Sequence, residues 1–146
     1  MPVNVEKASA EVEETLRKAL FGETLEYNLE AQPLNKSGNV SGVLTGGNLS
    51  ILYSLTGTPS DIQTQDKILF IEDLDEYLYH IDRMMMALKR SGMLANLSGL
   101  VVGGMTKMND NDIPFGKTAL EIIKEHVQEF NFPVAFGIPS GHQDHN

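Results

Sequence analysis

Apolar side chains recur along this chain at two spacings, one typical of helices and one typical of strands. Near the start, Val12, Leu16 and Leu20 lie on one face of an amphipathic helix, which Ser9 can cap and Gly22 can end. Three later segments show the same stripe. We therefore predict helices over residues 9–22, 49–55, 73–92 and 118–130.

Two of these helices have recognisable start signals. Asn48 precedes the helix expected at 49–55 and can cap it. Asp73, followed three residues later by Glu76, has the spacing of a capping box. This box predicts that the longest helix begins at Asp73.

Other apolar runs have the length and period of strands. After Lys67, residues 68–71 form a continuous apolar run, which is typical of a strand buried on both faces and predicts a central place in a sheet. Residues 25–31 instead alternate apolar with polar, as a half-buried strand does. Strands are predicted over residues 25–31, 39–44, 67–71, 97–102 and 133–138. Helices mixed with strands indicate an α/β fold, with too little regular alternation for a simple doubly wound sheet.

Composition limits the classes of partner. The 146 residues suffice for one domain, and 11 Lys and Arg against 20 Asp and Glu give a net charge of −9. This charge repels nucleic acid and anionic membranes, so neither is expected as a partner. The absence of cysteine excludes a disulfide framework and a thiolate nucleophile. No apolar run approaches the roughly 18 residues of a membrane span and no secretory signal is recognised, so the chain reads as soluble.

Glu72 and His142 are the candidate catalytic residues. Glu72 directly follows a buried strand, where a carboxylate can orient a histidine by accepting its Nδ1 proton. His142 ends the turn Pro139-Ser140-Gly141-His142, from which an imidazole could transfer protons near neutral pH. The structural alternatives are an acid that stabilises a helix N-terminus and a solvated tail histidine. Ser140 is not in a Gly-x-Ser-x-Gly elbow, so the sequence shows no nucleophile.

Two further groups give weaker signals. Gly46, Gly47 and Asn48 precede a helix and could offer backbone N–H groups to an anion, which makes them candidate substrate-binding residues. A tight turn is the structural alternative, because no lysine follows the glycines as in a phosphate loop. Asp144 and His145 suggest a metal site in the tail, but a closed site needs more ligands than the tail supplies, and no metal is predicted.

Several motifs together resemble the C-terminal half of the LD-carboxypeptidases, the muramoyltetrapeptide carboxypeptidase family. Their order and spacing match throughout, and the resemblance spans nearly the whole chain from the first helix onward. The combination is specific, although each motif alone is weak. The motifs are Gly46-Gly-Asn-Leu-Ser50, Gly57-Thr58, Lys67-Ile-Leu-Phe-Ile-Glu-Asp73, Tyr79-His-Ile-Asp-Arg-Met84, residues 99–103 and Pro139-Ser-Gly-His142.

The resemblance implies a swivelling β/β/α domain with a mixed sheet flanked by helices. It also implies an N-terminal flavodoxin-like domain in the same polypeptide, which supplies the nucleophilic serine and the oxyanion hole. Carried over by motif, Glu72 and His142 become the glutamate and histidine of a Ser-Glu-His triad. The implied reaction is hydrolysis of the amide between an L-diamino acid and a terminal D-alanine in a murein tetrapeptide. It belongs to cytoplasmic cell-wall recycling and needs no cofactor.

Two alternatives and several expectations accompany this assignment. A microcin C immunity-type serine peptidase would use the same triad, whereas a free-standing binding domain would need neither Glu72 nor His142. We expect these two residues to lie on the same side of the sheet and face the missing domain, at a distance that can exceed hydrogen-bond reach. The surface around them is expected either to promote self-association or to leave the tail of residues 139–146 mobile, and the full-length protein is a possible homodimer. Residues 9–146 are expected to form the domain, and residues 1–8 to be an interdomain linker or a cloning remnant.

Overall fold

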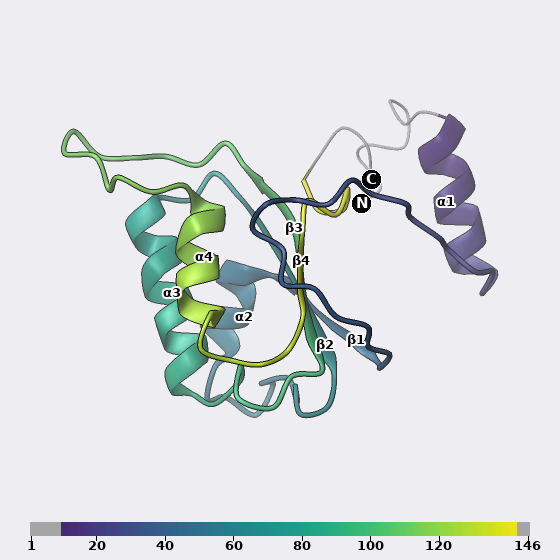
Figure 1. Ribbon diagram of the computed structural model, residues 1–146, viewed down its shortest axis with the longest axis horizontal. Helices are drawn as coiled ribbons and strands as arrows, with labels where there is room; N and C mark the ends of the chain where they lie inside the picture. Colours follow the sequence, from purple (N-terminus) through teal and green to yellow (C-terminus); the bar gives the residue numbers. More distant parts are fainter. Residues whose placement is uncertain (1–9, 143–146) are drawn as a thin grey trace.

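Helices and strands alternate regularly through most of the computed structural model, which describes residues 10–142 (Figure 1). The elements in chain order are α1 (Ala10–Leu20), β1 (Leu44–Asn48), α2 (Leu49–Leu55), β2 (Ile68–Leu74), α3 (Leu78–Arg90), β3 (Gly99–Thr106), α4 (Ala119–Val127) and β4 (Val134–Phe136). From β1 onward every strand is followed by a helix until β4 is reached. The expected irregular alternation was therefore wrong, and the α/β class is confirmed.

The four strands form one parallel sheet in the order β1-β2-β3-β4. Each helical connection moves one strand in the same direction, and right-handed crossovers then place α2, α3 and α4 on the same face, as Figure 1 shows. We expected a mixed sheet. Within residues 10–142, antiparallel pairing is limited to one isolated bridge between Lys36 and Val134, beside β4.

The hydrophobic core lies between the sheet and these three helices. On β2, the side chains of Leu69 and Ile71 are fully buried against this layer, together with Ile81 and Met85 of α3 and Ile123 of α4. Burial of such a side chain contributes about 1.5–3 kcal/mol to folding. The predicted central strand is thus confirmed, and its apolar half fixes the position of the polar residues that follow.

Two predicted strands differ from the structure. Residues 25–31 form no strand, and Leu25 and Tyr27 remain exposed, because alternation alone cannot stabilise a strand without a neighbour. The next strand begins at Leu44 rather than at residue 39. Leu44 pairs with Ile68, the first residue of β2, so earlier residues would extend past the beginning of that strand.

The start of α3 also differs from the prediction. Its N-cap is Tyr77, while Asp73 still belongs to β2, so the Asp73–Glu76 capping box was wrong. A complete capping box is found instead at α4, between Thr118 and Glu121. Hydrogen bonds from the Thr118 backbone N–H and hydroxyl lower the pKa of Glu121 below its ordinary value.

The first helix lies apart from the other three (Figure 1). Leu20 and Phe21, at its C-terminal end, are largely exposed. Its expected cap Ser9 and the expected linker 1–8 fall outside the described residues. None of the helices described here has the length and apolar character needed to cross a membrane.

Gly46→Ala is expected to destabilise the domain by about 3 kcal/mol, measured as the free energy of unfolding in urea. Gly46 has a φ of 126°, and an added Cβ would lie 2.0 Å from the backbone oxygen of Phe70 in β2. The β1–β2 pairing must therefore shift. Gly57→Ala is the matched control, because Gly57 has a φ of 74° with no atom within 4 Å of the added Cβ. It should cost only about 1–2 kcal/mol, and equal losses would contradict this explanation.

Candidate active site

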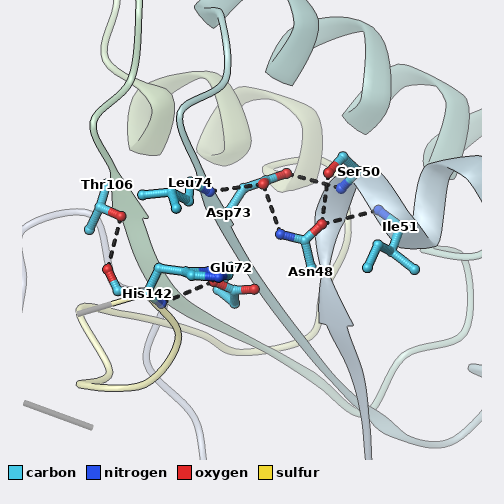
Figure 2. A network of polar contacts seen from close by, with 8 residues as sticks. All are labelled: Asn48, Ser50, Ile51, Glu72, Asp73, Leu74, Thr106 and His142. Atoms are coloured by element: carbon cyan, nitrogen blue, oxygen red, sulfur yellow. Dashed lines mark hydrogen bonds and ion pairs between the residues drawn. The ribbon is translucent and has the colours of Figure 1, made fainter. Parts of the chain in front are cut away.

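Polar residues from three neighbouring strands meet at the carboxyl edge of the sheet, where parallel strands end together (Figure 2). In open α/β sheets this edge is where ligands usually bind. Asn48 ends β1, Glu72 and Asp73 lie near the end of β2, and Thr106 ends β3. Asn48 and Glu72 are register partners on adjacent strands.

Adjacent carboxylates of β2 point to opposite faces of the sheet. Because side chains alternate along a strand, Asp73 faces the helical layer and Glu72 faces the other side, as Figure 2 shows. The pairing with β3 is irregular at this point. Ile71 pairs with Val102 and Asp73 with Met105, so β3 has one extra residue opposite Glu72. Such bulges are frequent next to active sites, where they redirect side chains.

Glu72 and His142 form a hydrogen-bonded pair. The Nδ1 of His142 lies 2.8 Å from Oε2 of Glu72, and the backbone N–H of His142 donates to the same oxygen at 3.2 Å. The Glu72 side chain is 7% exposed, whereas the imidazole is 52% exposed. A carboxylate without a proton can only accept a hydrogen bond, so the donor in this contact is Nδ1–H of His142. In the neutral ring with this proton on Nδ1, Nε2 is a hydrogen-bond acceptor. The expected position of the two residues on the same side of the sheet is confirmed, and they lie closer together than the prediction required. Their catalytic roles remain predictions.

Two glycines allow the tail after β4 to come this close. An added Cβ at Gly103 would lie 2.4 Å from the backbone oxygen of Ser140. One at Gly141, where φ is 111°, would lie 2.7 Å from Oε2 of Glu72. The N–H of Gly104 donates to the Ser140 oxygen at 2.9 Å. The tail therefore packs directly on the glycine bulge of β3.

The predicted substrate-binding residues Gly46, Gly47 and Asn48 are the last three residues of β1, so the turn expected there was wrong. The amide side chain of Asn48 is used within the domain. Nδ2 of Asn48 donates to Oδ1 of Asp73 at 2.8 Å, and Oδ1 of Asn48 accepts from the Ser50 hydroxyl at 2.7 Å and from the Ile51 N–H at 3.2 Å. The predicted helix cap is confirmed. Beside it, the position of an added Cβ on Gly47 has no atom within 4 Å.

Sequence reasoning missed two members of this network, Asp73 and Thr106. Asp73, 2% exposed, accepts from the Leu74 N–H at 2.8 Å and from the Ser50 N–H at 3.0 Å, besides its bond with Asn48. Thr106 donates its hydroxyl to the backbone oxygen of His142 at 3.0 Å. Asp73 would have been found only if the predicted strand had been continued past its apolar run, to the end of β2 at Leu74.

Among residues 10–142, neither a serine nucleophile nor a metal ligand set is recognised at this site. The side chains bonded to the imidazole of His142 within residues 10–142 include no serine hydroxyl. Asp144 and His145 lie outside the described residues. A separate cavity of about 480 Å³ lies at Tyr77 and residues 110–113, which do not include any member of this network.

Residues 41–146 match the family model of the LD-carboxypeptidase C-terminal domain. This chain belongs to that family. The matched segment holds the whole polar network, including Asn48, Glu72 and His142. The resemblance carried by the sequence motifs is thereby confirmed.

Named relatives show how much of a longer protein this domain represents. The probable murein peptide carboxypeptidase of Bacillus subtilis (strain 168) is 49% identical over 88 residues, which are 58% of this chain and 28% of that protein. The structure of muramoyltetrapeptide carboxypeptidase from Oxalobacter formigenes aligns with a TM-score of 0.80 at 28% identity, covering 94% of this chain and 47% of that one. The LD-carboxypeptidase C-terminal domain thus spans less than half the length of these relatives.

A microcin-immunity protein shares the fold more distantly. The microcin C7 self immunity protein MccF, in complex with aspartyl sulfamoyl adenosine, aligns with a TM-score of 0.62 at 26% identity. The alignment covers 71% of this chain and 31% of MccF. Both the structural likeness and the coverage are lower than for the carboxypeptidase from Oxalobacter formigenes.

Gly141→Ala is expected to separate His142 from Glu72 without unfolding the domain, because the added Cβ occupies the space of the carboxylate. The ¹⁵N resonance of His142 Nδ1, assigned by its absence in His142→Gln, should move to the value of a solvated histidine. Gly116→Ala is the control, since Gly116 has a φ of 82° and open space around its Cβ position. An unchanged His142 resonance in Gly141→Ala would contradict the packing described here.

Proposed function

We propose that this domain supplies the general base and its orienting carboxylate to a serine carboxypeptidase that acts on murein tetrapeptide. The observation that carries the proposal is the 2.8 Å contact between His142 Nδ1 and Glu72 Oε2, made by residues 70 positions apart. The contact leaves the far side of a half-exposed imidazole available to a reactant. This is the arrangement of a catalytic histidine held by a buried acid.

In the proposed mechanism, Nε2 of His142 removes the proton from a serine hydroxyl as the serine oxygen attacks the amide carbonyl that precedes the terminal D-alanine. The imidazolium then returns the proton to the departing amine, and the C–N bond breaks. Water then attacks the acyl-enzyme, with His142 again removing and returning the proton. This step releases the shortened peptide and the free serine. Throughout, Glu72 holds the ring orientation and stabilises its positive charge.

The serine and the oxyanion hole are proposed to come from an N-terminal flavodoxin-like domain of the same polypeptide. Two observations support this part. Within residues 10–142, Ser140 makes hydrogen bonds through its backbone, and its hydroxyl makes no bond to His142. The relatives are also at least twice as long as the aligned region. Residues 9–146 would then be the second domain, entered through residues 1–8, and cytoplasmic location and homodimer formation belong to the same proposal.

Gly46, Gly47 and Asn48 are proposed to line the substrate site. Asn48 is the register partner of Glu72, and the space above Gly47 is open, so a peptide could approach its backbone closely. The Asn48 amide is already bonded to Asp73 and Ser50, which assigns it to holding the junction of β1 and α2 as well.

Murein peptide is favoured over an acyl-sulfamoyl nucleotide as the substrate. The support is the 49% identity over 88 residues to the probable murein peptide carboxypeptidase. In addition, the TM-score is higher for the carboxypeptidase from Oxalobacter formigenes than for MccF, 0.80 compared with 0.62. A free-standing binding domain is disfavoured, because such a domain would need neither Glu72 nor the half-exposed imidazole that bonds it.

The isolated chain is expected to release no measurable D-alanine from murein tetrapeptide. Replacing the matching segment of the Bacillus subtilis relative with residues 41–146 should give an active chimera, because that protein would supply the serine. Ser140→Ala in the chimera should leave activity unchanged. Turnover by residues 1–146 alone that is abolished by Ser140→Ala would contradict the proposal.

In the same chimera, Glu72→Gln and His142→Gln should each reduce kcat by about 10³-fold or more. The loss arises because the base is absent or has no carboxylate to hold it. Glu125→Gln, at an exposed position paired with Lys117, is the control and should have no effect. Assays with aspartyl sulfamoyl adenosine test the alternative, and faster turnover of that compound than of murein tetrapeptide would overturn the substrate assignment.

A further inference from the structure

His142 is held at two different atoms of the sheet. Its backbone N–H and its Nδ1–H both donate to Oε2 of Glu72, and its backbone oxygen accepts from the hydroxyl of Thr106 (Figure 2). Two bonds that converge on one oxygen act as a pivot, about which the residue can still rotate. The third bond, to a different strand, removes that rotation.

Thr106 is well placed to provide a fixed donor. It is the last residue of β3 and pairs with Leu74 of β2, and its backbone oxygen accepts from the Asp75 N–H at 3.0 Å. A β-branched side chain also has few χ1 rotamers, so its hydroxyl position follows closely from the backbone. The donor is thus held by the same strand pairing that holds Glu72.

We infer that Thr106 is a positioning residue of the proposed carboxypeptidase, which fixes the direction of the His142 imidazole through the His142 carbonyl. This inference rests on the proposed function. It adds a residue that touches neither substrate nor the reacting atoms and acts only through His142. Without the Thr106 hydroxyl, the imidazole stays bonded to Glu72 but samples directions in which Nε2 does not face the serine.

The test uses Thr106→Val, which removes the hydroxyl and keeps the shape, and Thr106→Ser, which keeps the hydroxyl. In the active chimera, Thr106→Val should reduce kcat about 10- to 100-fold with KM unchanged, because small displacements of a base are costly. Thr106→Ser should recover most of the loss. Thr45→Val makes the same change in β1, at a residue that takes no part in the bonds holding His142, and should leave kcat unchanged.

A second measurement separates this inference from the proposed function. In the chain itself, the ¹⁵N and ring ¹H resonances of His142 should broaden or shift in Thr106→Val and recover in Thr106→Ser, at unchanged thermal stability. An unchanged His142 spectrum, or an active chimera that needs Glu72 but tolerates Thr106→Val, would overturn the inference. A chimera that is indifferent to Glu72→Gln would instead overturn the proposed function, while the spectra would still decide the role of Thr106.

Discussion

The parallel pairing of β2 with a neighbour on each side determines where every polar residue of the site lies. Because β1, β2 and β3 run in one direction, they end at a common edge, and partners such as Asn48 and Glu72 are about one strand spacing, roughly 4.8 Å, apart. The same pairing leaves the N–H of Gly104 available to the tail. This N–H donates to the backbone oxygen of Ser140, which holds the tail on β3. The site therefore depends on the register of the sheet more than on any single side chain.

Burial of two adjacent carboxylates would be unfavourable if they shared an environment. The strand alternation separates them, and each is compensated by its own donors. Asp73 accepts from the Asn48 amide and two backbone N–H groups on the helical face. Glu72 accepts from the backbone and the ring of His142 on the other face. Consequently Asp73 joins β1 to β2, and Glu72 joins β2 to the tail.

The central strand could be predicted because residues 68–71 are continuously apolar, and only a buried strand or helix segment tolerates such a run. The position at which this strand ends could not be predicted. Glu72 and Asp73 interrupt the apolar pattern, and the Asp73–Glu76 spacing imitates a capping box, while pairing with β3 in fact extends β2 to Leu74. Local patterns contain no information about the pairing of distant strands.

The candidate site, like the central strand, could be predicted only in part. Spacing alone left Glu72 and His142 with ordinary structural explanations, and the resemblance of the motifs brought them together. Thr106 lay beyond the predicted strand 97–102, because Gly103 and Gly104 resemble a strand breaker. In the structure they form a bulge, and the strand continues past them to Thr106.

The separation of Glu72 and His142 along the chain has a consequence for biosynthesis. At about 5–20 residues per second, the ribosome needs roughly 4–14 s to add the 70 positions between them. During that interval the nascent chain holds the buried carboxylate of Glu72 without the imidazole that donates to it. The hydrogen-bonded pair can form only after the segment that follows β4 has been synthesised and has packed on β3.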